Sequence, residues 1–277
     1  MKPNFLFIGP DKTGSSWMYE ILRQHPHCFV PLCKDIYFFD RDYERGLDWY
    51  FGLFQGATPS HLAIGELSHD YLFSVTAAER IYKDLPEVKL ITCLRHPVER
   101  TFSHYLFMVR SGRTQDSFES ALQNYPEIIH NSLYHHHLKE YFQRFPKEQI
   151  KVLFFKNLQK APIQFVKELF EFIHIPFVPD LDYEKKILPA ARPRNFAIAR
   201  LAKLSATMAR DLGLVTMVGV IKRSAIVRFL YEPLPAQDRP IVAEETIIDL
   251  LMTFKEDTLL LQDLLQTDLS DWLTFKQ

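Results

Sequence analysis

Near its beginning the chain reads Phe5-Leu-Phe-Ile-Gly-Pro-Asp-Lys12-Thr-Gly14-Ser-Ser-Trp17. Its first four residues form a short apolar run, which is typical of a strand buried on both faces of a parallel sheet. The two glycines and the proline predict a turn after this strand. Ser15 and Ser16 are residue types that favour the N-cap of a helix, and apolar residues at helical spacing continue to His25. The stretch therefore predicts a strand, a turn and an amphipathic helix in immediate succession.

The junction between this strand and this helix is suited to an anion. Backbone N–H groups at a helix start point outward and carry the positive end of the helix dipole, and Lys12 adds a full positive charge. In the Walker A motif of nucleoside triphosphatases the lysine directly follows the last glycine. Here Lys12 precedes Gly14 by two positions. We interpret the stretch as a loop for phosphate or sulfate that differs from Walker A, the alternative being a turn with an incidental lysine.

Length and charge limit what the chain can be. Its 277 residues are enough for a large core, and we expect one domain over residues 1–277. The formal net charge of −1 provides no general attraction for nucleic acid, so any anion site must be local. We see no repeats, low-complexity segments or linkers.

Cysteine usage and hydropathy predict the compartment. Three cysteines without a CxxC spacing argue against a disulfide framework and for a reducing environment. The sequence shows no signal peptide and no run close to the roughly 20 apolar residues of a membrane span. We therefore expect a soluble, cytoplasmic protein without a transmembrane segment.

A second strand-turn-helix pattern lies at residues 88–105. Its apolar strand ends at Leu94 and is followed by Arg95-His-Pro-Val-Glu-Arg-Thr-Phe-Ser103. A kinase of the P-loop type would place a magnesium-binding aspartate near this strand end. A guanidinium can instead hold two phosphate oxygens, and a hydroxyl can add a hydrogen bond. Because ligands bind outside the carboxyl ends of parallel strands, we expect both patterns to face one crevice.

Two charged segments follow apolar stretches. Lys34 and Asp35 are embedded in the apolar segment 29–40, where they are either surface neighbours or part of a cleft beside Lys12. His69 follows a predicted strand that begins near residue 62, and it is either a solvated loop histidine or a base. The residues alone leave both alternatives open.

Together these motifs resemble those of the sulfotransferases that use 3′-phosphoadenosine 5′-phosphosulfate (PAPS), of the bacterial kind similar to the carbohydrate or heparan sulfate type. The segment 9–16 resembles their 5′-phosphosulfate loop, Gly-x-x-Lys-x-Gly-[Ser/Thr]-[Ser/Thr], and the segment 95–103 resembles their 3′-phosphate motif, Arg-x-Pro-x-x-Arg-x-x-Ser. A later proline-rich loop, 180–194, resembles loosely the one that closes over the 3′-phosphate and the adenosine. The resemblance thus implies a donor site made of Gly9, Lys12, Thr13, Gly14, Ser15, Ser16, Trp17, Arg95, Ser103, Arg192 and Arg194.

The segment Lys34-Asp-Ile-Tyr-Phe-Phe-Asp40 resembles the family's Lys-Glu-x-His-Phe-Phe-Asp, whose glutamate is assigned as the catalytic base. Asp35 stands at the position of that glutamate and Tyr37 at that of the histidine. The segment 65–71 resembles Gly-Glu-Lys-[Ser/Thr]-Pro-x-Tyr, with Leu67 in place of a lysine that contacts the acceptor and His69 in place of proline. The implied catalytic residues are Lys12, Lys34, Asp35 and His69, and the reserve bases are Glu66 and His104.

The resemblance implies a three-layer, P-loop-like α/β fold in which helices flank a central parallel sheet, with a helical C-terminal part. The expected enzyme moves a sulfuryl group from PAPS to a hydroxyl of a sugar, lipid or small natural product and leaves adenosine 3′,5′-bisphosphate. No metal is expected, because Lys12 and the loop amides can neutralise the leaving phosphate. The alternatives are an ATP-dependent small-molecule kinase of the P-loop type and a non-catalytic nucleotide-binding module.

Three features are left open or are interpreted as structural. Histidines 135–137 do not predict a metal site, since successive helical residues point about 100° apart, and we expect a solvated face. The basic stretch 216–231 is predicted to be a helix that either packs with its basic side chains reaching solvent or touches a membrane surface or a partner. The acceptor, the oligomeric state and the choice between Asp35 and a histidine as base stay open.

Overall fold

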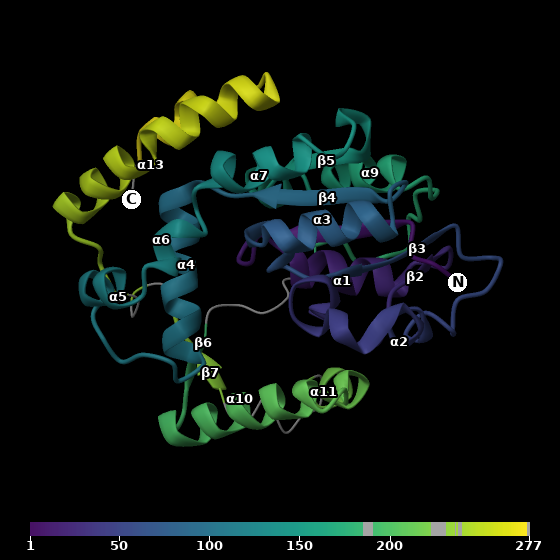
Figure 1. Ribbon diagram of the computed structural model, residues 1–277. Coiled ribbons are helices and arrows are strands. Elements are labelled where there is room, and N and C mark those ends of the chain that lie inside the picture. Colours follow the sequence, from purple (N-terminus) through teal and green to yellow (C-terminus); the bar gives the residue numbers. More distant parts are fainter. Residues whose placement is uncertain (185–190, 223–230, 236, 238–239, 276–277) are drawn as a thin grey trace. The chain divides into compact units, whose positions relative to one another are not determined.

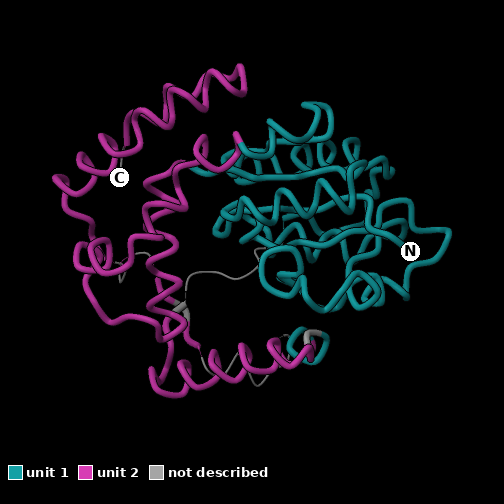
Figure 2. Tube along the Cα trace, in the orientation of Figure 1, with its two compact units in different colours: residues 1–95, 140–187, 215–219 teal, residues 96–139, 188–214, 220–277 magenta. Residues whose placement is uncertain are grey.

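The fold is given by a computed structural model, which describes residues 1–184, 191–222, 231–235, 237 and 240–275 (Figure 1). The chain divides into two compact units (Figure 2). The first unit comprises residues 1–95, 140–187 and 215–219, and the second comprises residues 96–139, 188–214 and 220–277. Because the units interleave along the chain, neither is one continuous segment. The single domain over residues 1–277 stays a prediction.

The first unit contains a parallel sheet. Its five strands are β1 Phe5–Gly9, β2 Cys28–Phe29, β3 Ala63–Leu67, β4 Lys89–Leu94 and β5 Ile150–Phe154. The strand order is β2-β3-β1-β4-β5, and every pair is parallel. The predicted strands are confirmed, whereas the two-residue strand β2 is too short to leave a periodic signal. Since β1 lies between β3 and β4, the segments that follow these three strands emerge side by side.

The helical segments of the first unit connect these strands or follow the last of them. They are α1 Ser15–Gln24, the π-helix η1 Phe38–Asp42, η2 Tyr43–Arg45, α2 Gly46–Gly52, η3 Tyr71–Phe73, α3 Val75–Asp84, η4 Lys147–Gln149, α8 Phe155–Lys160 and α9 Pro162–Phe172. Helices α7 Tyr134–Phe142 and α11 Val215–Lys222 contain residues of both units. The predicted P-loop-like arrangement, a central parallel sheet flanked by helices, is confirmed.

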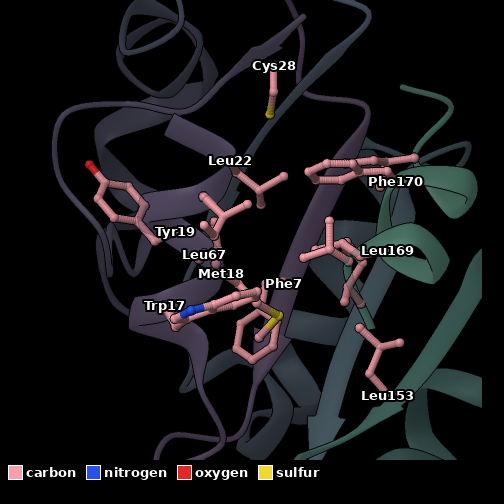
Figure 3. Packing of buried hydrophobic residues seen from close by; sticks show 14 of the residues in the cluster. Phe7, Trp17, Met18, Tyr19, Leu22, Cys28, Leu67, Leu153, Leu169 and Phe170 are labelled. Atoms are coloured by element: carbon pink, nitrogen blue, oxygen red, sulfur yellow. The ribbon is translucent and has the colours of Figure 1, made fainter. Parts of the chain in front are cut away.

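Helix α1 packs firmly on β1. Met18 is 1% exposed and belongs to one cluster with Phe7 of β1 and Leu169 of α9 (Figure 3). Burying a side chain of this size contributes about 1.5–3 kcal/mol relative to leaving it exposed. This packing fixes the direction of α1 and therefore the position of its first turn.

The second unit is mainly helical, as predicted for the C-terminal part. Its elements are α4 Pro97–Arg110, α5 Phe118–Asn124, α6 Glu127–His130, β6 Ala191–Pro193, α10 Phe196–Asp211, β7 Tyr231–Pro233, α13 Glu244–Leu265 and η6 Ser270–Leu273. Arg100 of α4 is fully buried and donates hydrogen bonds to the carbonyl oxygen of Ile128 and to Ser132. The second arginine of the motif at 95–103 therefore joins α4 to α6 and to the turn that follows it.

The prediction of a loop at residues 180–194 is wrong for the last part of this range. Residues 191–193 form β6, which pairs in antiparallel fashion with β7, and Arg192 forms an ion pair with Glu232 opposite it. This pairing could not be predicted, because each strand contains a proline and the two strands lie far apart in the sequence. Residues 185–190 of the predicted loop and residues 223–230 of the predicted helix 216–231 lie outside the described residues.

The histidine run is only partly solvated, so the prediction of a solvated face is wrong for His137. This side chain is 4% exposed and its Nε2 is bonded to the carbonyl oxygen of His130, and burial lowers its pKa to about 3. The carboxylate of Asp257 accepts the backbone N–H groups of His135 and His136. Within the part of the chain that is described, no three His, Cys, Asp or Glu side chains are placed to hold a metal ion. Among the described helices, none has both the length and the apolar character required to span a bilayer.

Candidate active site

The loop predicted to bind the donor, residues 9–14 and called the donor loop below, connects β1 to α1 and makes close backbone contacts. Gly9 has φ 130°, and a Cβ atom there would overlap the carbonyl oxygen of His69. Gly14 has φ 89°, and a Cβ atom there would lie 2.6 Å from a methyl carbon of Leu158. Both positions require glycine, because other residues avoid positive φ and would meet these neighbours. The loop is thus packed directly against the segment that carries His69.

The start of α1 differs from the prediction. The N-cap is Gly14 rather than Ser15 or Ser16, and among the described residues no side chain provides a cap hydrogen bond there. A glycine in the left-handed conformation closes the loop one residue earlier than a serine cap would. The first-turn amides of α1 therefore begin next to the donor loop without a serine cap, which is the geometry that favours a bound anion.

Thr13 of the loop and residues at the start of α1 stabilise this geometry. Thr13 donates a hydrogen bond from its hydroxyl to the carbonyl oxygen of Pro10 at 2.8 Å. Trp17 is 8% exposed and packs edge-on against Phe165. Ser15 is buried. The roles of these residues in donor binding stay predictions.

Lys12 and Arg95 meet at the ends of adjacent strands. Lys12 is half-buried, and its carbonyl oxygen lies 3.4 Å from the Nη1 donor of Arg95. The guanidinium of Arg95 lies over the ring of Phe155, 4.8 Å from its centroid. The side chain of Arg95, from one motif, thus contacts the backbone of the loop that carries Lys12, from the other.

Three further predicted donor residues belong to the second unit. Ser103 is half-buried on α4, Arg194 is exposed, and Arg192 lies in β6. Their contacts with the donor stay predictions.

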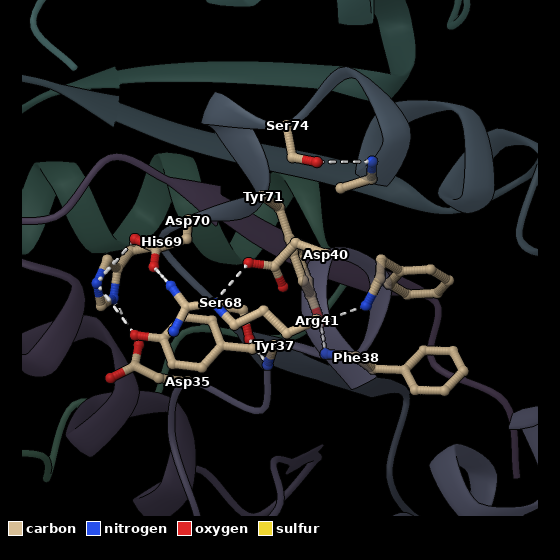
Figure 4. A network of polar contacts seen from close by, with 12 residues as sticks. Asp35, Tyr37, Phe38, Asp40, Arg41, Ser68, His69, Asp70, Tyr71 and Ser74 are labelled. Atoms are coloured by element: carbon tan, nitrogen blue, oxygen red, sulfur yellow. Dashed lines mark hydrogen bonds and ion pairs between the residues drawn. The ribbon is translucent and has the colours of Figure 1, made fainter. Parts of the chain in front are cut away.

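A compact acid-base cluster follows β3 (Figure 4). The Oδ1 atom of Asp35 accepts hydrogen bonds from Lys34 Nζ at 2.8 Å and from His69 Nδ1 at 2.7 Å. The three side chains are only 11–20% exposed, so Lys34 and Asp35 are not surface neighbours. Since a carboxylate only accepts, the shorter contact, to Asp35 at 2.7 Å, favours the proton of a neutral His69 on Nδ1, which makes Nε2 the basic nitrogen.

The surroundings of His69 favour its charged form. Burial by itself lowers the pKa of His69, but the carboxylates of Asp35 and Asp70 outweigh burial and raise this pKa above 6.5. Its Nε2 lies 3.2 Å from the hydroxyl of Tyr37 and 3.2 Å from Asp70 Oδ1. The imidazole is therefore held between two carboxylates beside a phenol.

Tyr37, Arg41 and Asp70 are members of this network that were not predicted as site residues. The guanidinium of Arg41 stacks over the ring of Tyr37 at 4.1 Å and forms ion pairs with Asp70 and Asp40. Burial raises the pKa of Asp40 to about 7. The signal in the sequence was the exchange of residue types: a tyrosine where the resembling enzymes have histidine, and a histidine where they have proline.

The backbone of the site is strained. Lys12, Asp35 and Tyr37 have φ angles of 66°, 64° and 61°, and they are three of five non-glycine residues with positive φ in the described chain. Each such residue costs on the order of 1–3 kcal/mol and persists only where its surroundings determine it. Strain of this kind is concentrated at functional sites.

Two reserve bases are placed elsewhere. Glu66 is fully buried and accepts hydrogen bonds from Tyr50, Tyr71 and Ser68, so it is not a base for a bound acceptor. His104 belongs to the second unit, where its Nδ1 lies 3.2 Å from Arg100 Nη2. Leu67, at the position of an acceptor-binding lysine in the resembling enzymes, is 1% exposed in the core.

Comparison with known proteins gives consistent matches. The model of the sulfotransferase domain matches residues 2–203. The membrane-associated sulfotransferase kil1 of Dictyostelium discoideum is 31% identical over 151 residues, which are 51% of this chain and 32% of that protein. Heparan sulfate glucosamine 3-O-sulfotransferase 5 of Mus musculus is 29% identical over 188 residues, which are 63% of this chain and 54% of that protein.

A solved structure is similar over the whole chain. The crystal structure of a sulfotransferase from Alicyclobacillus acidocaldarius is 26% identical, with a TM-score of 0.68, and the match covers 99% of this chain and 100% of that one. By contrast, the chain spans only about a third and about half of the two curated relatives.

Proposed function

Because the chain belongs to the sulfotransferase domain family, we propose that it transfers a sulfuryl group from PAPS to a hydroxyl group of an acceptor. The observation that carries the proposal is the packing of Gly9 in the donor loop against the backbone of His69, whose imidazole is bonded to Asp35. The loop that we propose to bind the anion is thus adjacent to the Asp35–His69 pair. A non-catalytic nucleotide-binding module would need only the loop.

The chain's residues fit this donor. The first-turn amides of α1 and the ammonium group of Lys12 would hold the 5′-phosphosulfate, and Arg95 would hold the 3′-phosphate. PAPS supplies the sulfuryl group and a phosphate leaving group. Lys12 would stabilise the negative charge that develops on the leaving oxygen as the sulfur–oxygen bond breaks.

His69 would act as the base. It would take the proton of the acceptor hydroxyl on Nε2 while the new oxygen–sulfur bond forms. Asp35 would hold Nδ1–H and stabilise the imidazolium, and Lys34 would fix the orientation of Asp35. This arrangement corresponds to that of other base-orienter pairs, in which the carboxylate holds the imidazole and does not itself take the proton.

We propose a carbohydrate hydroxyl as the acceptor. The name of the mouse relative, a heparan sulfate glucosamine 3-O-sulfotransferase, supports a sugar. The buried Leu67 replaces an acceptor-binding lysine, which supports a less anionic sugar than heparan sulfate. A cytoplasmic location is part of the proposal, and it is supported by Cys28, Cys33 and Cys93, which form no disulfide.

The choice of donor tests the proposal against a small-molecule kinase. Adenosine 3′,5′-bisphosphate should raise the melting temperature, whereas ATP with magnesium should not. Incubation with PAPS and a panel of neutral and charged oligosaccharides, followed by mass spectrometry, should detect a sulfated product. Stabilisation by ATP with magnesium alone, together with a phosphorylated product, would support the kinase.

Arg95 should distinguish nucleotides by their 3′-phosphate. Losing one partner of a desolvated charge pair costs roughly 2–5 kcal/mol of binding. We therefore expect Arg95→Ala to bind adenosine 3′,5′-bisphosphate far more weakly, while its affinity for adenosine 5′-monophosphate hardly changes. Calorimetry with both nucleotides measures this difference. Equal losses for the two would show that Arg95 does not read the 3′-phosphate.

A further inference from the structure

Glu66 is a buried carboxylate that the proposed chemistry does not use. It lies in β3, beside Leu6 of the central strand β1, and it is 1% exposed. Its Oε1 accepts the hydroxyls of Tyr50 at 2.9 Å and Tyr71 at 2.8 Å, and its Oε2 accepts the hydroxyl of Ser68 at 2.6 Å. Burying a carboxylate costs free energy unless hydrogen bonds compensate, so the groups that donate to Glu66 indicate what it does in the structure.

Two of these three hydroxyl groups also accept hydrogen bonds from the segment that carries Asp35. Ser68 Oγ accepts the backbone N–H of Tyr37 at 3.1 Å, and the hydroxyl of Tyr71 accepts that of Phe38 at 2.9 Å. These are the amides two and three residues after Asp35. The hydroxyl of Tyr50 donates to Glu66, but no backbone amide of this segment donates to it among the described hydrogen bonds.

The same network also reaches the other partner of the acid-base pair. Ser68 directly precedes His69, and the backbone N–H of Asp35 donates to the carbonyl oxygen of Leu67 at 2.9 Å. Asp35 and Tyr37 hold positive φ angles, which need fixed surroundings. Because Ser68 and Tyr71 donate their hydroxyl hydrogens to Glu66, their oxygen lone pairs point at the backbone N–H groups of Tyr37 and Phe38.

We propose that Glu66 is a positioning residue that sets the Asp35–His69 geometry through Ser68 and Tyr71. The predicted effect on turnover rests on the proposed function. The predicted effect on the pKa of His69 does not. The positioning role differs from a role in general stability, because only two of the three hydroxyls bonded to Glu66 should matter for the site.

The matched pair Tyr71→Phe and Tyr50→Phe tests this. Each substitution removes one buried hydroxyl bonded to the same oxygen of Glu66 and keeps the ring. With PAPS and the acceptor found for the wild type, Tyr71→Phe and Ser68→Ala should lower kcat about 10-fold with little change in the KM for PAPS, since small misplacements of reacting groups are costly. Tyr50→Phe should stay within about twofold of the wild type, because its hydroxyl does not reach the Asp35 segment.

The second readout is the pKa of His69, followed by nuclear magnetic resonance of its imidazole. In Tyr71→Phe and Ser68→Ala this pKa should fall toward the ordinary value of about 6.5, because Asp35 is less well placed. In Tyr50→Phe the pKa of His69 should not move, although the melting temperature should fall in this variant as well, since it also loses a buried hydrogen bond to Glu66. Glu66→Gln, which can still accept from both tyrosines, should retain more turnover than Glu66→Leu.

Equal changes of kcat and of the His69 pKa in both tyrosine variants would overturn the proposal, as would unchanged values in both. If the wild type sulfates no acceptor but the His69 pKa follows the expected pattern, the proposed function fails and the positioning role stands. If activity is present but the two variants are indistinguishable, the positioning role fails alone.

Discussion

Lys12→Ala is expected to lower sulfuryl transfer by at least about 100-fold while the protein stays folded, since one preorganised charge on a developing oxyanion contributes several kcal/mol. Lys12 is half-buried at the point where β1 ends, next to the uncapped first turn of α1. Its charge cannot be replaced by water without reorganisation. Single-turnover rates with saturating PAPS measure the effect on the chemical step.

The control for Lys12 is Lys160→Ala, because Lys160 is exposed at the end of α8. It removes the same charge from the same unit and should leave the rate unchanged. Circular dichroism and the melting temperature establish that both variants are folded. A folded Lys12→Ala protein with near-normal turnover would exclude Lys12 from the chemistry.

His69→Ala is expected to have the second large effect, a loss of about 100-fold to 10,000-fold in turnover, because it removes the proposed base. The pH dependence gives a separate test. His69 must be unprotonated to act as a base, and its pKa is raised above 6.5. We therefore expect kcat to fall as the pH is lowered through this raised pKa. In Asp35→Asn the carboxylate that raises this pKa is gone, and the acid limb should move to lower pH while measurable activity survives.

The comparison of the two variants identifies the base. If Asp35→Asn abolishes transfer while His69→Ala stays within about threefold of the wild type, Asp35 itself takes the proton, as its counterpart glutamate does in the resembling enzymes. If Asp35→Asn transfers sulfate within about threefold of the wild type while His69→Ala stalls, Asp35 only orients the imidazole.

The parts of the fold that could be predicted are those that depend on residues close together in the sequence. The apolar run at 5–8, the glycines of the loop and the helical spacing after it predict β1, the turn and α1, and the same holds for β4 and α4. The N-cap was wrong by one residue because glycine geometry outweighed serine propensity. The pairing of β6 with β7 depends on residues about 40 positions apart and has no local signal.

The site was predicted only as a set of residues. Lys12, Lys34, Asp35 and His69 could be chosen from their types and positions. The hydrogen bond between Asp35 and His69 joins residues 34 positions apart and follows from the sheet order. The burial of Glu66 could not be predicted either, since it depends on tyrosines that arrive from α2 and η3.

The adjacency of Tyr37 and His69 has a consequence for how relatives of this chain are recognised. Their rings lie 5.6 Å apart, although one follows Asp35 and the other follows β3. A column-by-column alignment would register a lost histidine at position 37 and a missing proline at position 69, and a filter based on either column would discard the chain. A filter defined by space, which asks whether an imidazole lies within hydrogen-bonding reach of the acidic residue, would keep it. Members of the family that have exchanged these two residues are therefore recognised by a model of the whole domain, which matches this chain over residues 2–203, or by a three-dimensional template, and not by a signature of single columns.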